Sequence, residues 1–319
     1  MRPPSMSGFI GIDWSGAKGP QQQGIQLAVA APGRTAPLSI ACPDQRYWGR
    51  VAVTDYLIAR AESAIVAGQG PILVGIDFAF SHPFLDVNAF YPGADDAPQT
   101  AAALWAHIDA INAKQDHFYG GGIFSDPIYG AYYLSPRDFK APLYASRRRQ
   151  CEVAARAAGR SPSPTFKAVG ADNVATGSLA GMRVLHHLKQ RLGSGVCVWP
   201  FDPIERAADP SCGLVMTEIF PSFHFHRVGF DPAKKAALDP AFLSAALAAY
   251  DSDGVTADFV PSGQDADEAD AMIAAAALRF YAPDWAMWQV PEAARIEGWI
   301  FGVPADDNPP LADGQLVGK

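Results

Sequence analysis

The sequence predicts an α/β fold in which helices flank one mixed β-sheet, and three observations indicate it. Residues 8–13, 24–31 and 37–42 are short apolar runs separated by turn-forming residues, a pattern typical of neighbouring antiparallel strands. Residues 50–67 have the apolar spacing of a helix, and another apolar run starts at Ile72. Because strands joined by a crossover helix run parallel, the sheet should contain both strand orientations.

The helix predicted at 50–67 has a single apolar stripe. The stripe consists of Val53, Leu57, Ala61 and Ile65. Glycines follow the last turn of this helix and end it. One side of the helix should therefore pack against the core of the protein.

Residues 81–165 differ in composition from the segments on either side. They are rich in proline, glycine and aromatic residues, and only one helix, at 98–112, is expected among the loops. Long stretches with little secondary structure are usually lids or binding loops in compact proteins. We therefore interpret this region as a loop-rich insertion that caps the strand ends, rather than as an independent domain.

Regular structure resumes in the second half of the chain. Its predicted elements are a helix at 176–192, a short apolar run at 195–200, a strand at 213–219, and helices at 239–250 and 266–281. We expect one domain over residues 1–304 and a flexible tail at 305–319, because the tail is polar and rich in proline.

Composition and charge limit the classes of function. The chain has 319 residues, of which 49% are hydrophobic, and no apolar run has the roughly 20 residues of a membrane helix. Its start lacks the apolar region of a signal peptide, so we expect a cytoplasmic protein without a membrane partner. The four cysteines are widely spaced, which predicts reduced thiols rather than a zinc or redox motif; they are Cys42, Cys151, Cys197 and Cys212.

The net charge of −8 argues against a broadly basic surface for nucleic acid. A local basic groove remains compatible with this charge, and the run Arg147, Arg148 and Arg149 is one candidate for it. The interpretation we favour for this run is a solvated helix start or loop.

Two aspartates stand out because each ends an apolar strand with the residues Gly-Ile-Asp. They are Asp13 and Asp77. Open α/β sheets bind their ligands at the carboxyl ends of their strands. Two such aspartates on adjacent parallel strands would lie side by side and repel, unless a metal ion or a cationic substrate group neutralised them.

Three further acidic residues extend this pair. Glu218 lies near the end of the strand at 213–219, and Asp267 and Asp270 lie three apart on one helix, so they share a face. Carboxylate oxygens suit Mg²⁺ or Mn²⁺, and such ions promote phosphodiester cleavage. Simpler alternatives are that Asp267 complements the helix dipole and that Glu218 closes a turn.

Four residues are candidates for contacts to substrate phosphates. Lys18 follows the turn after the first strand, Lys167 precedes the helix at 176–192, and Thr176 and Ser178 lie at the start of that helix. The alternative for Thr176 and Ser178 is that they cap the helix. Three residues next to the acids would shape the pocket or simply pack in the core; they are Trp14, Phe78 and His82.

An ordered set of motifs resembles the family called "domain of unknown function 429". The motifs are Gly-Ile-Asp-Trp-Ser-Gly at 11–16, Gly-Ile-Asp-Phe-Ala-Phe-Ser-His-Pro at 75–83, the segment from Phe166 to Met182, Thr-Glu-Ile-Phe-Pro at 217–221, Asp-Glu-Ala-Asp-Ala at 267–271 and Glu-Gly-Trp-Ile at 297–300.

The resemblance covers about residues 8–304 and implies an RNase H-like fold, with three antiparallel strands, two further parallel strands and helices on both faces. It also implies that the first strand supplies Asp13, the fourth strand Asp77, and the last helix Asp267 and Asp270. It implies no fixed role for Glu218.

We therefore expect a hydrolase, a nuclease of this lineage, that cleaves phosphodiesters with Mg²⁺ or Mn²⁺. Its catalytic residues would be Asp13, Asp77, Glu218 and Asp270, and Asp267 would be a further metal ligand. Nucleic acid would be bound through local contacts. The alternatives are an ATP-dependent phosphotransferase of the actin-like or sugar-kinase type, and a catalytically silent RNase H-like binding protein.

Overall fold

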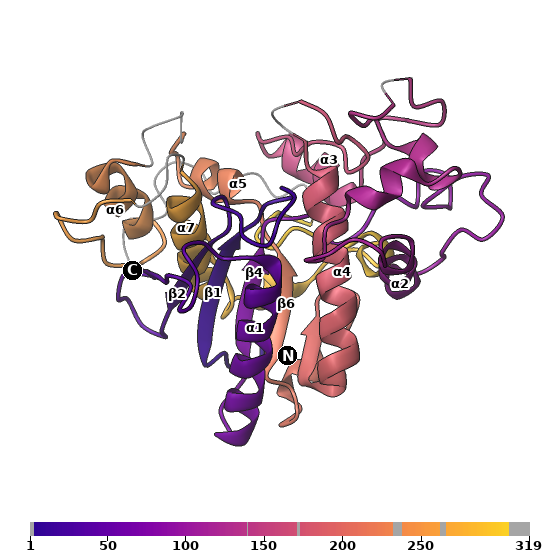
Figure 1. Ribbon diagram of the computed structural model, residues 1–319. Helices are drawn as coiled ribbons and strands as arrows, with labels where there is room; N and C mark the ends of the chain where they lie inside the picture. The colour runs from indigo at the N-terminus through magenta and orange to yellow at the C-terminus, as the bar shows by residue number, and fades with distance from the viewer. Residues whose placement is uncertain (1–2, 139, 171–172, 232–237, 262–265, 306–319) are drawn as a thin grey trace.

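A six-stranded mixed sheet in the order β3-β2-β1-β4-β6-β5 forms the centre of the computed structural model of this protein (Figure 1). The structure describes residues 3–138, 140–170, 173–231, 238–261 and 266–305. The strands are β1 (Gly8–Asp13), β2 (Gln26–Ala30), β3 (Leu38–Ser39), β4 (Ile72–Ile76), β5 (Val196–Val198) and β6 (Leu214–Glu218).

Both strand orientations occur in this sheet, as the sequence predicted. β2 pairs antiparallel with β1 and with β3, whereas β4 is parallel to β1, and β6 is parallel to β4 and to β5. The α/β class and the mixed sheet are therefore confirmed. The short apolar run expected at 195–200 adds β5 as a third parallel strand after β4 and β6, so the sheet is one strand wider than the resemblance implies.

Eight α-helices surround the sheet in the described ranges. They are α1 (Arg50–Val66), α2 (Ala101–Ile111), α3 (Gln150–Ala157), α4 (Ala175–Leu192), α5 (Pro221–Arg227), α6 (Pro240–Ala248), α7 (Asp267–Tyr281) and α8 (Ala294–Glu297). Three of them, α3, α5 and α8, were not predicted. Helices of four to eight residues are stabilised by packing rather than by propensity, so a sequence pattern gives little sign of them.

The expectation of a single helix within 81–165 was wrong. Besides α2, this region contains α3 and the short 3₁₀ helices η1 (Gly121–Ser125) and η2 (Tyr129–Tyr132). Its apolar side chains, such as Tyr91 and Leu104, join the same hydrophobic cluster as the sheet residue Ile76. The insertion therefore shares the hydrophobic core on one face of the sheet.

The sheet has an apolar core on each of its faces. Alternate residues of a strand point to opposite faces. Ile10 and Ile12 belong to one cluster, with side chains of α1 and α4, and Phe9 belongs to the other, with side chains of α5 and α7. Figure 1 shows this layering, with α1 in front of the sheet and α7 behind it.

Glycine at position 11 allows α7 to pack directly against the sheet. A Cβ atom on Gly11 would lie 2.2 Å from the carbonyl oxygen of Ala271 and 2.7 Å from the backbone nitrogen of Ala275. Gly75 lies opposite Gly11 in the register of β1 and β4. The close contact fixes the first turn of α7 near the end of β1, which explains the glycine two residues before Asp13.

No helix within the described ranges combines the length and the apolar character needed to cross a membrane. The tail predicted at 305–319 lies outside the described residues from position 306 onward.

Candidate functional site

Asp13 and Asp77 lie side by side where β1 and β4 end. Asp13 is the last residue of β1, and Asp77 directly follows β4. The backbone N–H of Asp77 donates a hydrogen bond of 3.0 Å to the carbonyl oxygen of Ile12, and that of Ile219 donates one of 3.1 Å to Ile76. The backbone after β4 is thereby held between the ends of β1 and β6, as expected for parallel strands.

The first turn of α7 brings two more carboxylates to the same edge of the sheet. Asp267 is the first residue of α7, and Asp270 lies three residues further along the helix. Gln26 pairs with Asp13 in the register of β1 and β2, and Gly24 lies two residues before it. A Cβ atom added to Gly24 would lie 3.3 Å from Oδ2 of Asp267, so Asp267 is close to this strand end. The predicted meeting of Asp13, Asp77, Asp267 and Asp270 is therefore present as a neighbourhood, named here the aspartate cluster.

The aspartate cluster is electrostatically strained. Burial raises the pKa of Asp13 well above its usual value, and the charges of Asp270, Asp77 and Asp267 raise it further, although the Trp14 N–H, 2.9 Å from Oδ1, opposes this. Burial and the charges of Asp270 and Glu218 raise the pKa of Asp77. Burial and the charge of Asp267 raise the pKa of Asp270 to about 7.

None of the ion pairs found within the described ranges includes Asp13, Asp77 or Asp270. Buried charges without a counterion are costly, so this edge of the sheet favours a cation from outside the chain. The donor chemistry suits a hard divalent cation, because every donor is a carboxylate oxygen. However, across the part of the chain that is described, no three His, Cys, Asp or Glu side chains are arranged so that they could hold a metal ion.

Glu218 is placed differently from the aspartates. Its two carboxylate oxygens accept hydrogen bonds of 2.6 and 2.7 Å from Arg149, and one of them also accepts the N–H of Phe80 at 3.0 Å. The Nε of Arg149 donates to Glu152 at 2.8 Å. These three charged residues, almost fully buried, are named here the arginine–glutamate cluster. Glu218 therefore anchors the backbone after Asp77 through Phe80, and its catalytic role stays a prediction.

The run Arg147, Arg148 and Arg149 lies in a loop at the start of α3, as the favoured interpretation has it, but Arg147 and Arg149 are neither solvated nor part of a basic groove. Arg147 forms an ion pair with Asp86 at 2.6 Å and donates to three backbone carbonyl groups. Arg149 is 1% exposed. Arg147 thus ties segments of the insertion to one another, whereas Arg149 ties the insertion to Glu218 at the end of β6.

Glu297, the first residue of the Glu-Gly-Trp-Ile motif at 297–300, holds the same region together. Its Oε1 accepts hydrogen bonds from the N–H groups of Phe84 and Leu85, and its Oε2 accepts one from Gln150 at the start of α3. The sequence indicated no role for Glu152 or Glu297, and it indicated no buried ion pair for Arg149. The acidic residue in each of the two motifs at 217–221 and 297–300 was the one available signal.

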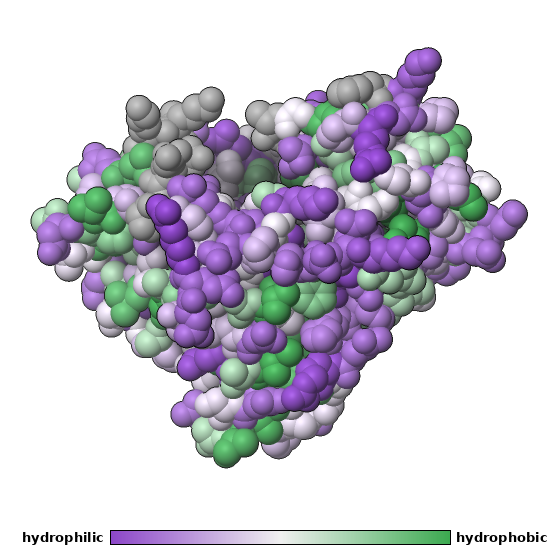
Figure 2. All heavy atoms as spheres, in the orientation of Figure 1, coloured by the Kyte–Doolittle hydropathy of each residue, from purple (hydrophilic) through white to green (hydrophobic). Residues whose placement is uncertain are grey.

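A cavity of about 230 Å³ opens beside the aspartate cluster. It is lined by Trp14, Gly16, Asp77, Phe78, Ala79, Arg149, Glu152, Pro162, Ser163, Asn173, Val174, Gly177, Glu218, Ile219, Phe220 and Ile300. Trp14 and Phe78 therefore shape this cavity, as one interpretation of the sequence suggested. Figure 2 shows the surface notched at the top of the molecule, between the part formed by α6 and α7 and the part formed by α3 and α4.

His82 packs in the core instead of lining the cavity. Its ring nitrogens lie 2.9 Å from the Thr165 hydroxyl and 2.8 Å from the Tyr133 hydroxyl, and its ring stacks on Phe166. Burial, together with the charges of Arg149 and Arg147, lowers its pKa well below the usual value. The neutral ring therefore serves packing rather than proton transfer.

The four candidate phosphate contacts separate into different roles. Ser178 is fully buried, and its Oγ accepts the Ala79 N–H at 3.1 Å, so it holds the loop after Asp77. The N-cap of α4 is Val174, so Thr176 and Ser178 do not cap this helix. Lys167 lies just before α4, where its carbonyl oxygen accepts the N–H of Ala175 at 3.2 Å.

Lys18 and Thr176 line a second hollow next to the first. The structure therefore brings two of the four residues together in one place where solvent or a ligand can reach them.

Comparisons with protein-family models, with curated proteins and with solved structures give no match for this chain.

Proposed function

We propose that this protein is a metal-dependent phosphodiesterase, a nuclease, in which Asp13, Asp77 and Asp270 hold Mg²⁺ or Mn²⁺ and Asp267 lies beside them. One observation carries the proposal: the aspartate cluster joins buried carboxylates from the ends of β1 and β4 and from α7, and the charge of Asp270 raises the pKa of both Asp13 and Asp77. Within the described residues, no cationic side chain is paired with these three. A bound ion would have to draw the carboxylates together, since their present positions form no three-ligand group.

The proposal includes an RNase H-like fold related to the family "domain of unknown function 429". Support comes from the order β3-β2-β1-β4-β6, with β2 antiparallel to its neighbours and β4 and β6 parallel to β1. Further support is that the acids the resemblance assigns lie at strand ends and on the helix that packs against them.

The chain's own residues would orient the site before a substrate arrives. The N–H of Trp14 holds one oxygen of Asp13, leaving the other oxygen for a ligand. The N–H groups of Ala79 and Phe80 are tied to Ser178 and Glu218, so the backbone after Asp77 is fixed from both sides. A bound divalent ion would supply charge neutralisation and an activated water.

The same two hydrogen bonds bear on the phosphotransferase alternative. In a phosphate loop, the N–H groups that follow the strand point at the phosphates of the nucleotide. Here the N–H groups of Ala79 and Phe80 are already engaged inside the protein. Phosphodiester hydrolysis is therefore the function that the geometry supports better.

The test is cleavage of labelled single-stranded, duplex and RNA–DNA hybrid oligonucleotides with Mn²⁺, Mg²⁺ or EDTA. We expect cleavage that needs the metal and falls to background in Asp13→Asn and Asp77→Asn. The matched control is Asp55→Asn, which changes an exposed aspartate on α1 and should keep full activity. Equal cleavage by the wild type and Asp13→Asn would sink the assignment. Metal binding without cleavage of any substrate would favour a binding protein.

A further inference from the structure

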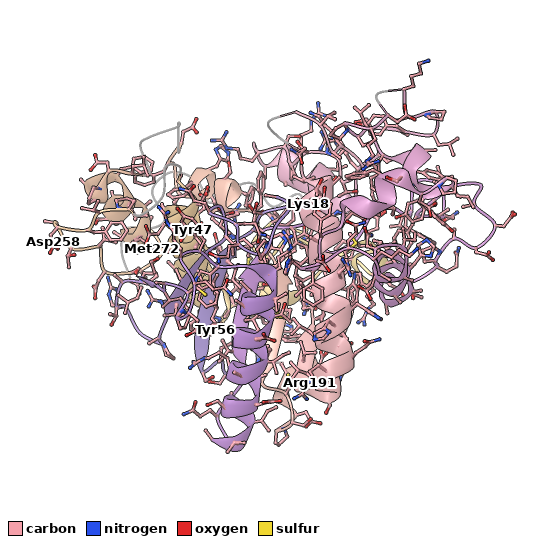
Figure 3. All side chains as sticks on the ribbon, in the orientation of Figure 1. Lys18, Tyr47, Tyr56, Arg191, Asp258 and Met272 are labelled. Atoms are coloured by element: carbon pink, nitrogen blue, oxygen red, sulfur yellow. The ribbon has the colours of Figure 1, made fainter. Side chains whose placement is uncertain are left out.

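A second hollow, of about 290 Å³, lies beside the cavity that contains Asp77. Its lining includes two cationic side chains, Lys18 and Arg137, and two aromatic rings, Tyr119 and Phe124. Thr176 adds a hydroxyl group. Figure 3 shows Lys18 beside the upper part of α4, above the sheet.

The charge of this hollow is opposite to that of its neighbour. No carboxylate is among the described residues that line it, whereas three carboxylates line the first cavity. Neither Lys18 nor Arg137 takes part in an ion pair found in the described ranges. Both side chains are exposed at the surface, so they can meet an anion from solvent.

The aromatic rings add a different kind of contact. The Nζ of Lys18 lies 5.8 Å from the centre of the Tyr119 ring. A ligand in the hollow could therefore contact the ammonium group and the ring at the same time. Both rings are half-buried and keep part of their surface in the hollow. Proteins that bind single strands combine cations for the backbone with aromatic rings on which the bases stack.

Two glycines that line the first cavity adjoin a residue that lines the second hollow. Gly16 and Gly177 line the first cavity, and Thr176 lines the second. A Cβ on Gly16 would lie 2.5 Å from the backbone nitrogen of Gly177, so the two segments are in direct contact. Neither glycine has a side chain to block a strand that passes from one hollow to the other.

We propose that the second hollow binds one nucleotide of a single-stranded nucleic acid whose neighbouring phosphodiester lies at the aspartate cluster. The inference rests on the proposed function and names its substrate class: an oligonucleotide strand with unpaired bases. Lys18 and Arg137 would neutralise its phosphate, and Tyr119 would stack on its base. A base in a duplex is stacked on its neighbours, so it would not reach the rings.

Binding is measured by the anisotropy of fluorescein-labelled ten-nucleotide thymidine and uridine strands in EDTA, over a series of salt concentrations. We expect the double variant Lys18→Ala/Arg137→Ala to bind about tenfold or more weakly. Its salt dependence should fall by about 0.7 units of slope, since the one phosphate that Lys18 and Arg137 neutralise loses both contacts. Tyr119→Ala should weaken binding about tenfold at every salt concentration. The two labelled strands separate RNA from DNA as the preferred ligand.

The matched control is Arg60→Ala/Arg156→Ala, which removes two exposed arginines on α1 and α3 and should bind like the wild type. Equal loss of binding in both double variants would overturn the proposal, because charge alone would then explain it. Duplex binding as tight as single-strand binding would also overturn it. The measurement needs no cleavage, so absence of Mn²⁺-dependent hydrolysis would count against the proposed function and leave this binding result standing.

Discussion

Two groups of buried acids meet at the same edge of the sheet, and they differ in whether the chain supplies a counterion. In the arginine–glutamate cluster, Arg149 binds Glu218 with two hydrogen bonds and Glu152 with a third. In the aspartate cluster, no described ion pair reaches Asp13 or Asp77. Glu152 and Glu218 are satisfied within the fold, whereas the repulsion among Asp13, Asp77 and Asp270 is relieved by protonation or by an added cation.

The contrast separates acids that build the site from acids that would act in it. Burial raises the pKa of Glu152, but its ion pair with Arg149 pulls the pKa back down. For Asp77, every charge that acts on its pKa is a carboxylate and raises it. An acid at a strand end is therefore a candidate ligand only when no arginine from elsewhere in the chain reaches it.

The largest expected effect comes from breaking the satisfied cluster. Arg149→Met would leave Glu218 and Glu152 buried without a counterion, so we expect a loss of about 3–5 kcal/mol in the free energy of unfolding, measured in urea. Arg156→Ala, on the exposed side of the same helix, should change it by less than about 0.5 kcal/mol. A similar loss of unfolding free energy in both variants would contradict the claim that Arg149 is the counterion that satisfies the two buried glutamates.

Relieving the strained cluster should have the opposite sign. Without metal at pH 8, Asp270→Asn should raise the free energy of unfolding by about 1–3 kcal/mol, because it removes a buried repelling charge. The pKa of Asp270 is raised to about 7, so the folded wild type holds a proton that the unfolded chain releases above about pH 4. The contribution of Asp270 to the free energy of unfolding of the wild type is therefore fully present below about pH 4, and it is lost as the pH rises through 7.

The advantage of Asp270→Asn should therefore vanish below about pH 4 and be complete above pH 7, in denaturation curves recorded with EDTA. Asp55→Asn is the control and should show no such pH dependence. If Asp270→Asn were less stable than the wild type at pH 8, the repulsion assigned to this cluster would be wrong.

The smallest effect should come from breaking an exposed ion pair, which tests whether burial sets the strength of such pairs. Arg191 and Glu62 lie 3.2 Å apart, and their side chains are 58% and 51% exposed. Arg191→Ala should change the free energy of unfolding by about 0–1 kcal/mol, and less in high salt. A loss as large as that of Arg149→Met would show that burial does not set the strength of these pairs.

Local patterns predicted that Asp13 and Asp77 lie together, whereas the family resemblance implied that Asp267 and Asp270 join them. A crossover helix makes β1 and β4 parallel, so Asp13 and Asp77 must lie together once both strands exist. The three-residue spacing of Asp267 and Asp270 places both on the first turn of one helix. Each of these two steps uses a short-range rule. The glycine at position 11 is the residue that permits the close contact with α7.

The arginine–glutamate cluster could not be predicted in the same way. Arg149, within the insertion, contacts Glu218 from 69 residues away in the sequence, and no periodic pattern predicts such a contact. A run of arginines looks solvated in a sequence because arginine is usually exposed. Ser178 was likewise read as a helix cap or phosphate contact, whereas its partner is a backbone N–H on another segment.

The most direct test of the central claim is a calorimetric titration of the protein with Mn²⁺ at pH 8. We predict that the wild type and Asp55→Asn bind the ion with a dissociation constant of millimolar or below, and that Asp13→Asn and Asp77→Asn lose this binding. No heat of binding at millimolar Mn²⁺, or undiminished binding in Asp77→Asn, would contradict the claim that the aspartate cluster is a metal site.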